Sequence, residues 1–127
     1  RHWVTKQEWV EVSDLERTVI DGLRRPELCG GITEVAKGLW MRHGGMNVER
    51  LIAYALRTRV GTVARRLGYL LELYELADAA GLSSLKDALT PTYVPLDPIL
   101  PKDGPHIASW RLRLNISREE LLQVREG

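Results

Sequence analysis

VSDLERTVIDGLRRPELCGGITEVAKGL, residues 12–39, decides the fold because it holds the start and stop signals of two helices. Ser13 and Glu16 have the spacing of a capping box, in which the serine hydroxyl accepts from the Glu16 N–H and the carboxylate reaches back to the serine N–H. Apolar residues then recur at helical spacing up to Pro26, which disfavours helical geometry in the residue before it. A second amphipathic pattern follows the glycines at residues 30–31. The stretch therefore predicts two helices joined by a Pro–Gly connector.

Helical patterns continue through the middle of the chain. Asn47 opens a third helix, whose apolar residues follow the i, i+3, i+4, i+7 pattern of a helix with one face on a core. A fourth helix begins near Gly61, and its two apolar stripes predict that it is the most buried and that Gly81 is its C-cap. Ser83 begins a short further turn, which we expect to end near Leu89.

The two ends of the chain have the patterns of strands. Residues 3–12 are rich in Trp, Val and Thr, which favours a strand. Prolines recur between residues 91 and 105, where they exclude regular helix and leave only short extended pieces. Residues 110–116 alternate apolar with polar side chains, which predicts a half-buried strand with a basic face. Ser117 and Glu120 form a second capping box before a last short helix.

These elements predict one α+β domain over residues 1–127, mainly helical, with about four main helices and a small sheet. We expect Trp9–Val12 and Trp110–Ile116 to pair in that sheet. The chain opens at Arg1 with no initiator Met and no signal-peptide pattern, so we interpret it as a piece of a longer protein.

Composition narrows the class of protein. The net charge of +1 argues against a generic polyanion binder, although arginines cluster locally. No run of about 18 apolar residues could span a bilayer, so no membrane partner is expected. A single cysteine allows neither an intrachain disulfide nor a Cys-based zinc site, which predicts a cytoplasmic location.

The residues that could bind a metal or a cofactor are not spaced as a binding motif in the sequence. His2, His43 and His106 are scattered and have no Cys, Asp or His partner at metal-binding spacing, so we predict no metal and no cofactor. Cys29 could be a nucleophile, but a lone cysteine in an apolar connector more often packs as a small buried residue.

The acids of the first helix have two interpretations. Asp14, Glu16 and Asp21 could hold Mg²⁺ in a nuclease site. Arg17 lies three residues after Asp14 and four before Asp21, so an ion-paired helix surface is the simpler interpretation. The glycine pairs match no phosphate-binding loop. We therefore predict no catalytic residues and no enzymatic activity.

Arginines are the remaining functional signal. Those that close the third helix and open the fourth could crowd one edge of the domain, and others lie on the basic face of the late strand. They could neutralise DNA phosphates or bind an acidic protein surface. Alternatively, some could only complement the dipole at a helix C-terminus while the others are simply solvated. The pair Arg24-Arg25 is a weaker case. The candidate DNA-binding residues are Arg57, Arg59, Arg65, Arg66, Arg111 and Arg113. Trp40, Tyr74 and Trp110 fall on apolar stripes and are predicted to be core.

Residues 12–39 resemble the start of the C-terminal domain of AbiEi-type antitoxins, the regulators of type IV toxin–antitoxin and abortive-infection systems. The matching features there are the strand running into Ser13, the residues Glu16-Arg17-Thr18 and Asp21, the Arg-Pro-Glu-Leu connector and the Gly-Gly pair. Further matches lie at residues 66–72 (RLGYLLE), 93–98 (YVPLDP) and 110–115 (WRLRLN), so the similarity covers nearly the whole chain.

The resemblance implies a function that involves no catalysis. Members of this family carry an N-terminal winged helix-turn-helix that binds their own promoter, and that part is absent from this chain. The domain similar to this one neutralises a nucleotidyltransferase-like toxin, without need of a stable complex, and assists promoter DNA binding in autorepression. The alternatives are a DNA-binding transcriptional regulator unrelated to a toxin and, with less support, a Mg²⁺-dependent nuclease.

Overall fold

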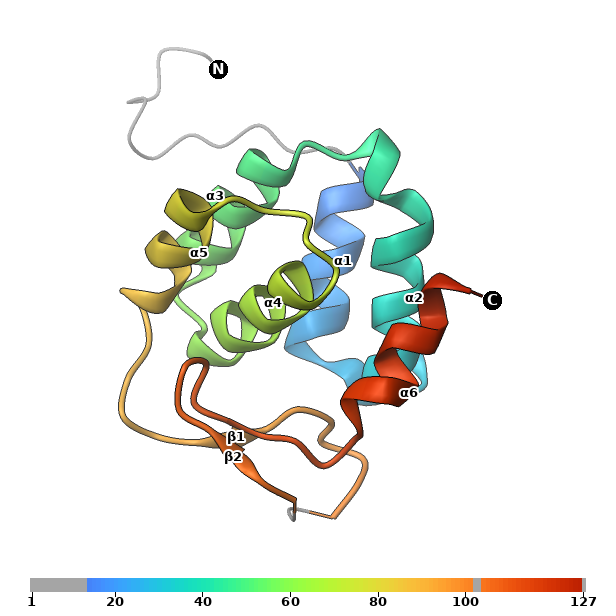
Figure 1. Cartoon of the computed structure of the whole chain (residues 1–127). Helices are drawn as coiled ribbons and strands as arrows, with labels where there is room; N and C mark the ends of the chain where they lie inside the picture. Colours follow the sequence, from blue (N-terminus) through green and yellow to red (C-terminus); the bar gives the residue numbers. More distant parts are fainter. Residues whose placement is uncertain (1–13, 102–103, 127) are drawn as a thin grey trace.

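The computed structural model describes residues 14–101 and 104–126 (Figure 1). The fold is α+β and mainly helical, as predicted, with helices packed together above a small sheet. The helices are α1 Asp14–Arg24, α2 Ile32–Arg42, α3 Val48–Thr58, α4 Gly61–Leu73, α5 Ala79–Lys86 and α6 Arg118–Leu122, and the strands are β1 Val94–Pro95, β2 His106–Ile107 and β3 Leu112–Arg113. Short 3-10 turns follow α1, α2 and α6 at Pro26–Cys29, His43–Gly45 and Gln123–Arg125.

Local signals determine where several helices begin. The Asn47 side chain accepts from the Arg50 N–H at the start of α3, and the Ser117 hydroxyl accepts from the Glu120 N–H at the start of α6. Both predicted caps are confirmed. Ser13 lies outside the described residues, but the Glu16 carboxylate is buried and accepts from the Asn47 N–H at 2.8 Å. This contact joins the first turn of α1 to the start of α3.

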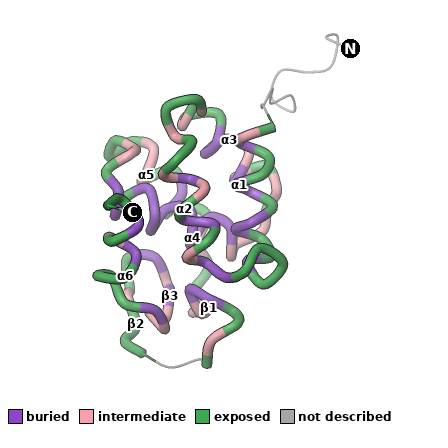
Figure 2. The backbone as a smooth tube through the Cα atoms, turned by 90° about the vertical axis from the view of Figure 1, so that its right-hand side faces the viewer, coloured by how far each residue is buried: buried purple, intermediate pink, exposed green. Residues whose placement is uncertain are grey.

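Helix α4 is the centre of the core. All its residues from Val63 to Leu71 are buried (Figure 2), and it packs against α1, α3 and α5. The prediction that it is the most buried helix is confirmed, but the prediction that it runs on to Gly81 is wrong. The helix ends at Leu73, where Glu75 takes a left-handed φ of 57° and the Leu76 N–H bonds back to the Leu71 carbonyl.

A new helix begins after that turn because Asp78 is an N-cap. Its carboxylate accepts from the Gly81 N–H at 2.8 Å, so Gly81 lies in the first turn of α5 rather than at a helix end. The apolar stripe continues across the break, and for this reason the sequence pattern suggested one long helix.

The sheet is smaller than the sequence suggested. Within the described residues its order is β1-β3-β2, with β1 parallel and β2 antiparallel to β3. The strand predicted over residues 110–116 shrinks to two residues. It begins only after Arg111, whose φ of 53° is outside the extended region, and it ends where the Asn115 N–H bonds back to the Arg113 carbonyl. Trp110, Leu112 and Ile116 are nevertheless buried, as the alternation predicted. The expected partner, Trp9–Val12, lies outside the described residues, and β1 and β2 flank β3 on its two sides.

Trp110 attaches this sheet to the helices. Its side chain is fully buried, and its indole N–H donates to the Glu72 carboxylate at 2.7 Å. The ring lies directly on Gly68 of α4, where a Cβ would come within 2.1 Å of the ring. Tyr74 is also buried, and its hydroxyl donates to the Leu121 carbonyl at 2.6 Å. The core assignments of Tyr74 and Trp110 are thus confirmed, and Trp40 is half-buried against the same core.

Two surface expectations are wrong. Cys29 is exposed rather than packed as a small buried residue, because its 3-10 turn runs along the surface. Arg17 does not pair with the acids of its own helix: ion pairs within the described residues join Arg25 to Glu27 and Lys37 to Glu34. Across residues 14–101 and 104–126, no helix combines the length and the apolar character needed to cross a bilayer.

The contact between Gly68 and Trp110 gives a test of the fold. Gly68→Ala should lower the free energy of unfolding by about 3 kcal/mol, because the new methyl displaces the indole. Gly38→Ala is the matched control, since nothing lies within 4 Å of a Cβ built there. It should raise the free energy of unfolding by about 0.5–1 kcal/mol through helix propensity. Urea denaturation measures both, and equal effects of the two changes would contradict this packing.

Candidate nucleic-acid interface

The six candidate arginines separate into a buried and a surface group. Arg65 and Arg66 on α4 are only 3% and 4% exposed. Arg57 and Arg59 are exposed, and Arg111 and Arg113 are half-buried. The expected edge of four guanidinium groups from residues 57 to 66 is therefore wrong, because two of them point inward.

Arg66 bridges three segments. Its Nη1 donates to the Leu23 carbonyl at the end of α1, at 2.9 Å, and its Nη2 donates to the Pro95 carbonyl of β1, at 3.0 Å. Burial lowers its pKa to about 10, and the negative charges of Asp97 and then Glu27 oppose that shift. The guanidinium thus stays charged at neutral pH and holds the Pro-rich loop against the helices.

Arg65 holds the start of the same loop. Its Nη2 donates to the Thr90 carbonyl at 3.0 Å, to the Thr90 hydroxyl at 2.7 Å and to the Thr92 carbonyl at 2.7 Å. Burial lowers its pKa, and the nearby charge of Arg111 lowers it further. Every residue type has a backbone carbonyl. The residue pattern therefore gives no sign that the guanidinium groups of Arg65 and Arg66 are buried.

Asp97 completes this buried polar network, and its role was missed at the level of sequence. It is 5% exposed; its Oδ2 accepts from the Ile32 N–H at 3.3 Å, at the start of α2, and its Oδ1 accepts from the Ile99 N–H at 3.1 Å. Gly31 makes room for it, since a Cβ there would come within 3.0 Å of Oδ2 and the residue has a φ of 107°.

Asn115 fixes the backbone on the other side of Asp97. Its Oδ1 accepts from the Asp97 N–H at 3.0 Å, and its Nδ2 donates to the Asp97 carbonyl at 2.7 Å and to the Pro101 carbonyl at 3.1 Å. An acid between Leu and Pro and an Asn at the end of a strand are the signals that could have suggested this pair.

The surface arginines come from two junctions of the fold. Arg57 closes α3, and Arg59 is its C-cap, with a left-handed φ of 56°. Arg111 has a φ of 53° just before β3, and Arg113 lies in that strand. A side chain in left-handed backbone costs about 1 kcal/mol or more, and Gly or Asn normally takes such positions. Strained positions of this kind are more frequent at functional sites.

Uncharged groups contact the side chains of Arg111 and Arg113, at the start of β3. The guanidinium of Arg111 lies 5.9 Å from the ring centre of Tyr93, which in turn meets His106 edge-on with ring centres 4.8 Å apart. Arg113 donates from Nη2 to the Gly104 carbonyl at 3.2 Å. These contacts orient the cations without neutralising them.

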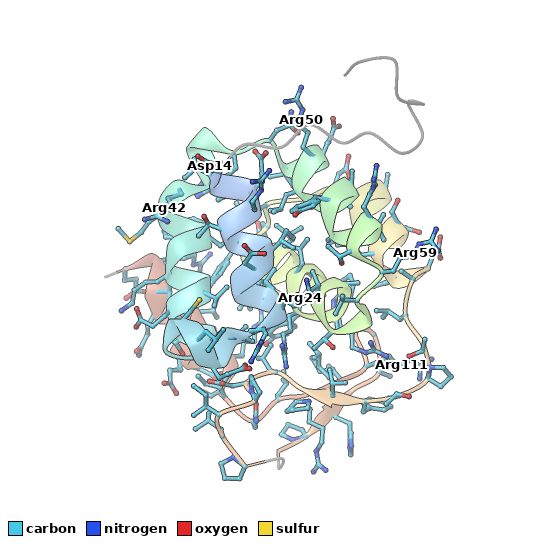
Figure 3. The ribbon with its side chains drawn as sticks, turned by 180° about the vertical axis from the view of Figure 1, so that it is seen from behind. Asp14, Arg24, Arg42, Arg50, Arg59 and Arg111 are labelled. Carbon is cyan, nitrogen blue, oxygen red and sulfur yellow. The ribbon has the colours of Figure 1, made fainter. Side chains whose placement is uncertain are left out.

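We define the arginine edge as Arg57, Arg59, Arg111 and Arg113. Within residues 14–101 and 104–126, none of these four forms an ion pair with a carboxylate. Figure 3 shows Arg59 and Arg111 along the same edge of the molecule, on the right of the view, whereas Arg50 lies at the top and Arg42 on the left. Buried Arg65 adds positive charge behind this edge, as its interaction with Arg111 indicates. Chemically, the arrangement suits an anion such as a phosphate.

The pair Arg24-Arg25 lies apart from this set. Arg25 is exposed and pairs with Glu27 at 3.2 Å, so its charge is partly neutralised. Arg24 is exposed in the last turn of α1, where it complements the helix dipole.

The acids of α1 do not converge. Glu16 is buried and its carboxylate binds the Asn47 N–H, whereas Asp14 and Asp21 are exposed. In the part of the chain that is described, no group of three His, Cys, Asp or Glu side chains is arranged to hold a metal ion. The nuclease interpretation thus has no geometric support from these residues.

Comparisons with protein-family models, with curated proteins and with solved structures give no match to this chain.

The Asp97 network yields a prediction about stability. Asp97→Ala should lower the free energy of unfolding by about 3 kcal/mol, because it leaves the Ile32 N–H without a partner and removes the nearest counter-charge of buried Arg66. Asp87→Ala is the control: this exposed acid follows the C-terminus of α5, and its loss should change stability by less than about 0.5 kcal/mol. Chemical denaturation distinguishes them, and a similar small effect for both would remove Asp97 from the network.

Proposed function

We propose that this chain is a non-catalytic, cytoplasmic regulatory domain of the antitoxin type, which assists promoter DNA binding through the arginine edge and counteracts a nucleotidyltransferase-like toxin. The observation that carries the proposal is that Arg59 and Arg111, both on strained left-handed backbone, lie along one edge of the molecule with no carboxylate partner in the described residues (Figure 3). The left-handed backbone at these two positions is costly to keep, and a guanidinium group is well suited to phosphates.

The DNA part of the proposal follows from the chemistry of arginine. A guanidinium offers a planar fork of donors to phosphate oxygens, and each phosphate neutralised releases counterions. Contacts of this type position a protein on DNA but do not read its sequence. The domain would therefore strengthen binding, while sequence reading belongs to a further DNA-binding element such as the winged helix-turn-helix of similar proteins.

The toxin part of the proposal rests on the resemblance. The residues that carry it are largely scaffold here: Arg66, Gly68, Asp97 and Asn115 belong to the buried contacts that assemble the fold. A shared scaffold supports a shared domain type, and the surface then supplies the function.

The arginine edge predicts the salt dependence of DNA binding. The variant Arg57→Gln/Arg59→Asn/Arg111→Asn removes three charges, and Asn suits the left-handed positions. The slope of log affinity against log salt should fall in magnitude by about 2–3, since each phosphate contact contributes about 0.9. Fluorescence anisotropy with a duplex from upstream of the chain's own gene, and with an unrelated duplex of equal length, measures it.

The matched control is Arg42→Gln/Arg50→Gln, which removes charge away from that edge, on the left and at the top of Figure 3. It should leave the slope almost unchanged. Both duplexes should lose affinity alike in the edge variant, because phosphate contacts are independent of sequence. An unchanged slope in the edge variant would make these arginines structural.

Co-expression tests the antitoxin activity itself. Expressed with the nucleotidyltransferase-like gene beside its own, the chain should relieve growth arrest, measured as colony counts. The destabilised Asp97→Ala variant should relieve it less. Continued arrest in the presence of folded wild-type chain, together with the salt effect above, would identify a DNA-binding regulator outside any toxin system.

A further inference from the structure

An apolar groove lies between α3 and α5. It has a volume of about 480 Å³, and both helices contribute to its walls, together with the turn that precedes α5. In Figure 1 the two helices lie side by side, away from the sheet. Its lining residues are Val48, Glu49, Ile52, Ala53, Leu56, Leu76, Ala77, Asp78, Ala80, Gly81 and Ser84.

Small residues keep this groove open. At its floor α3 and α5 approach closely, because a Cβ on Gly81 would come within 2.9 Å of the Ile52 side chain. Above that contact the walls carry Ala53, Ala80 and Ser84, which are too short to fill the space between the helices. Ile52 itself is buried, so the apolar surface that the groove offers comes from half-buried Val48, Leu56, Leu76 and Ala77.

A second hollow extends the groove along α3. It has a volume of about 210 Å³, shares Leu56 with the first and continues past Arg59 to the start of α4 and Ala88. The continuous surface follows the 11 residues of α3, a length of about 16 Å at 1.5 Å per residue. That length matches about three turns of a second helix.

The two ends of the groove carry opposite charges. Glu49 of α3 and the N-cap Asp78 of α5 line one end, and Arg59 lines the other. An occupant that complements both ends needs basic residues toward Glu49 and Asp78 and acidic residues toward Arg59.

We propose that this groove binds one amphipathic helix of a partner protein, with an apolar stripe on Leu56 and Leu76, Lys or Arg at the Glu49–Asp78 end and Asp or Glu at the Arg59 end. This is the helix-in-groove mode of recognition, read by anchors at i, i+3, i+4 and i+7. The inference goes beyond the proposed function and does not depend on it.

A second copy of this chain fits less well. Its large exposed hydrophobics within the described residues are Leu28, Met41 and Ile99. They lie in the 3-10 turn after α1, in α2 and in the loop between β1 and β2, and form no helical stripe. A compact small molecule also fits less well, because the surface is long and open and its polar groups do not converge.

The test uses designed peptides of about 14 residues, long enough to form a helix on binding. The matched peptide carries Leu at i, i+3, i+4, i+7 and i+11, Lys at one end and Glu at the other. A second peptide has the same composition in scrambled order, and a third has Glu at both ends. Anisotropy of the labelled peptides with the full chain should show binding about tenfold weaker or more for the scrambled peptide, and several-fold weaker for the third.

Variants of the chain locate the binding. Ala53→Gln and Ser84→Gln fill the groove from its two walls and should weaken the matched peptide about tenfold, while Arg50→Gln on the outer face of α3 should leave it unchanged. Glu49→Lys should restore binding of the peptide with Glu at both ends. Unchanged thermal unfolding confirms that the variants fold.

Three results would overturn the inference. The first is no binding of the matched peptide, or binding that the groove variants leave intact. The second is a concentration-dependent dimer of the chain alone, in sedimentation, that Ala53→Gln abolishes, which would assign the groove to self-association. The third is binding of an apolar dye that is lost in the Ala53→Gln variant, while no peptide binds. That result would assign the groove to small molecules.

Discussion

The guanidinium of Arg66 joins the parts of this domain that are far apart in sequence. It extends from α4 to the carbonyl of Leu23 in α1 and to that of Pro95 in β1. A buried cation needs oxygens for its donors and a counter-charge nearby. Here both Nη atoms of Arg66 donate to carbonyls, and Asp97 supplies the charge. Asp97 is at the same time held at the start of α2 by the Ile32 N–H. Helices and sheet therefore depend on one buried polar network.

The network explains why the Pro-rich segment is ordered although it has little regular structure. Two-residue strands cannot stabilise a sheet alone. Instead, Arg65 holds Thr90 and Thr92, Asn115 holds the backbone at Asp97, and Trp110 packs on Gly68. Side-chain donors on α4 and just after β3 thus replace the ladder of hydrogen bonds that a larger sheet would have.

Sequence reasoning succeeded where the signal is local and failed where the partner is distant. The caps at Asn47 and Ser117 and the stop at Pro26 depend on neighbours a few residues away. Both helix starts are present, and the first helix ends at Arg24, just before the proline. The burial of Arg65 and Arg66 depends on backbone carbonyls that lie 25 residues or more away in the sequence. Any residue type carries such a carbonyl, so the sequence gives no sign of it. The break before Asp78 was missed because the apolar stripe runs through it. Of the candidate site, Arg57 and Arg59 are exposed and Arg111 and Arg113 are half-buried, whereas the Asp97 network was not foreseen.

The buried arginines also set the geometry of the exposed ones. Arg111 precedes β3, whose register with β1 is Val94 opposite Leu112, and Arg66 holds β1 through the Pro95 carbonyl. Tyr93, which faces the Arg111 guanidinium, lies next to Thr92, the residue that Arg65 holds. A guanidinium positioned on such a support loses less entropy when it binds an anion than one on a free surface chain. Arg65 and Arg66 therefore contribute to the arginine edge although they are buried behind it. They fix the backbone that carries Arg111 and Arg113.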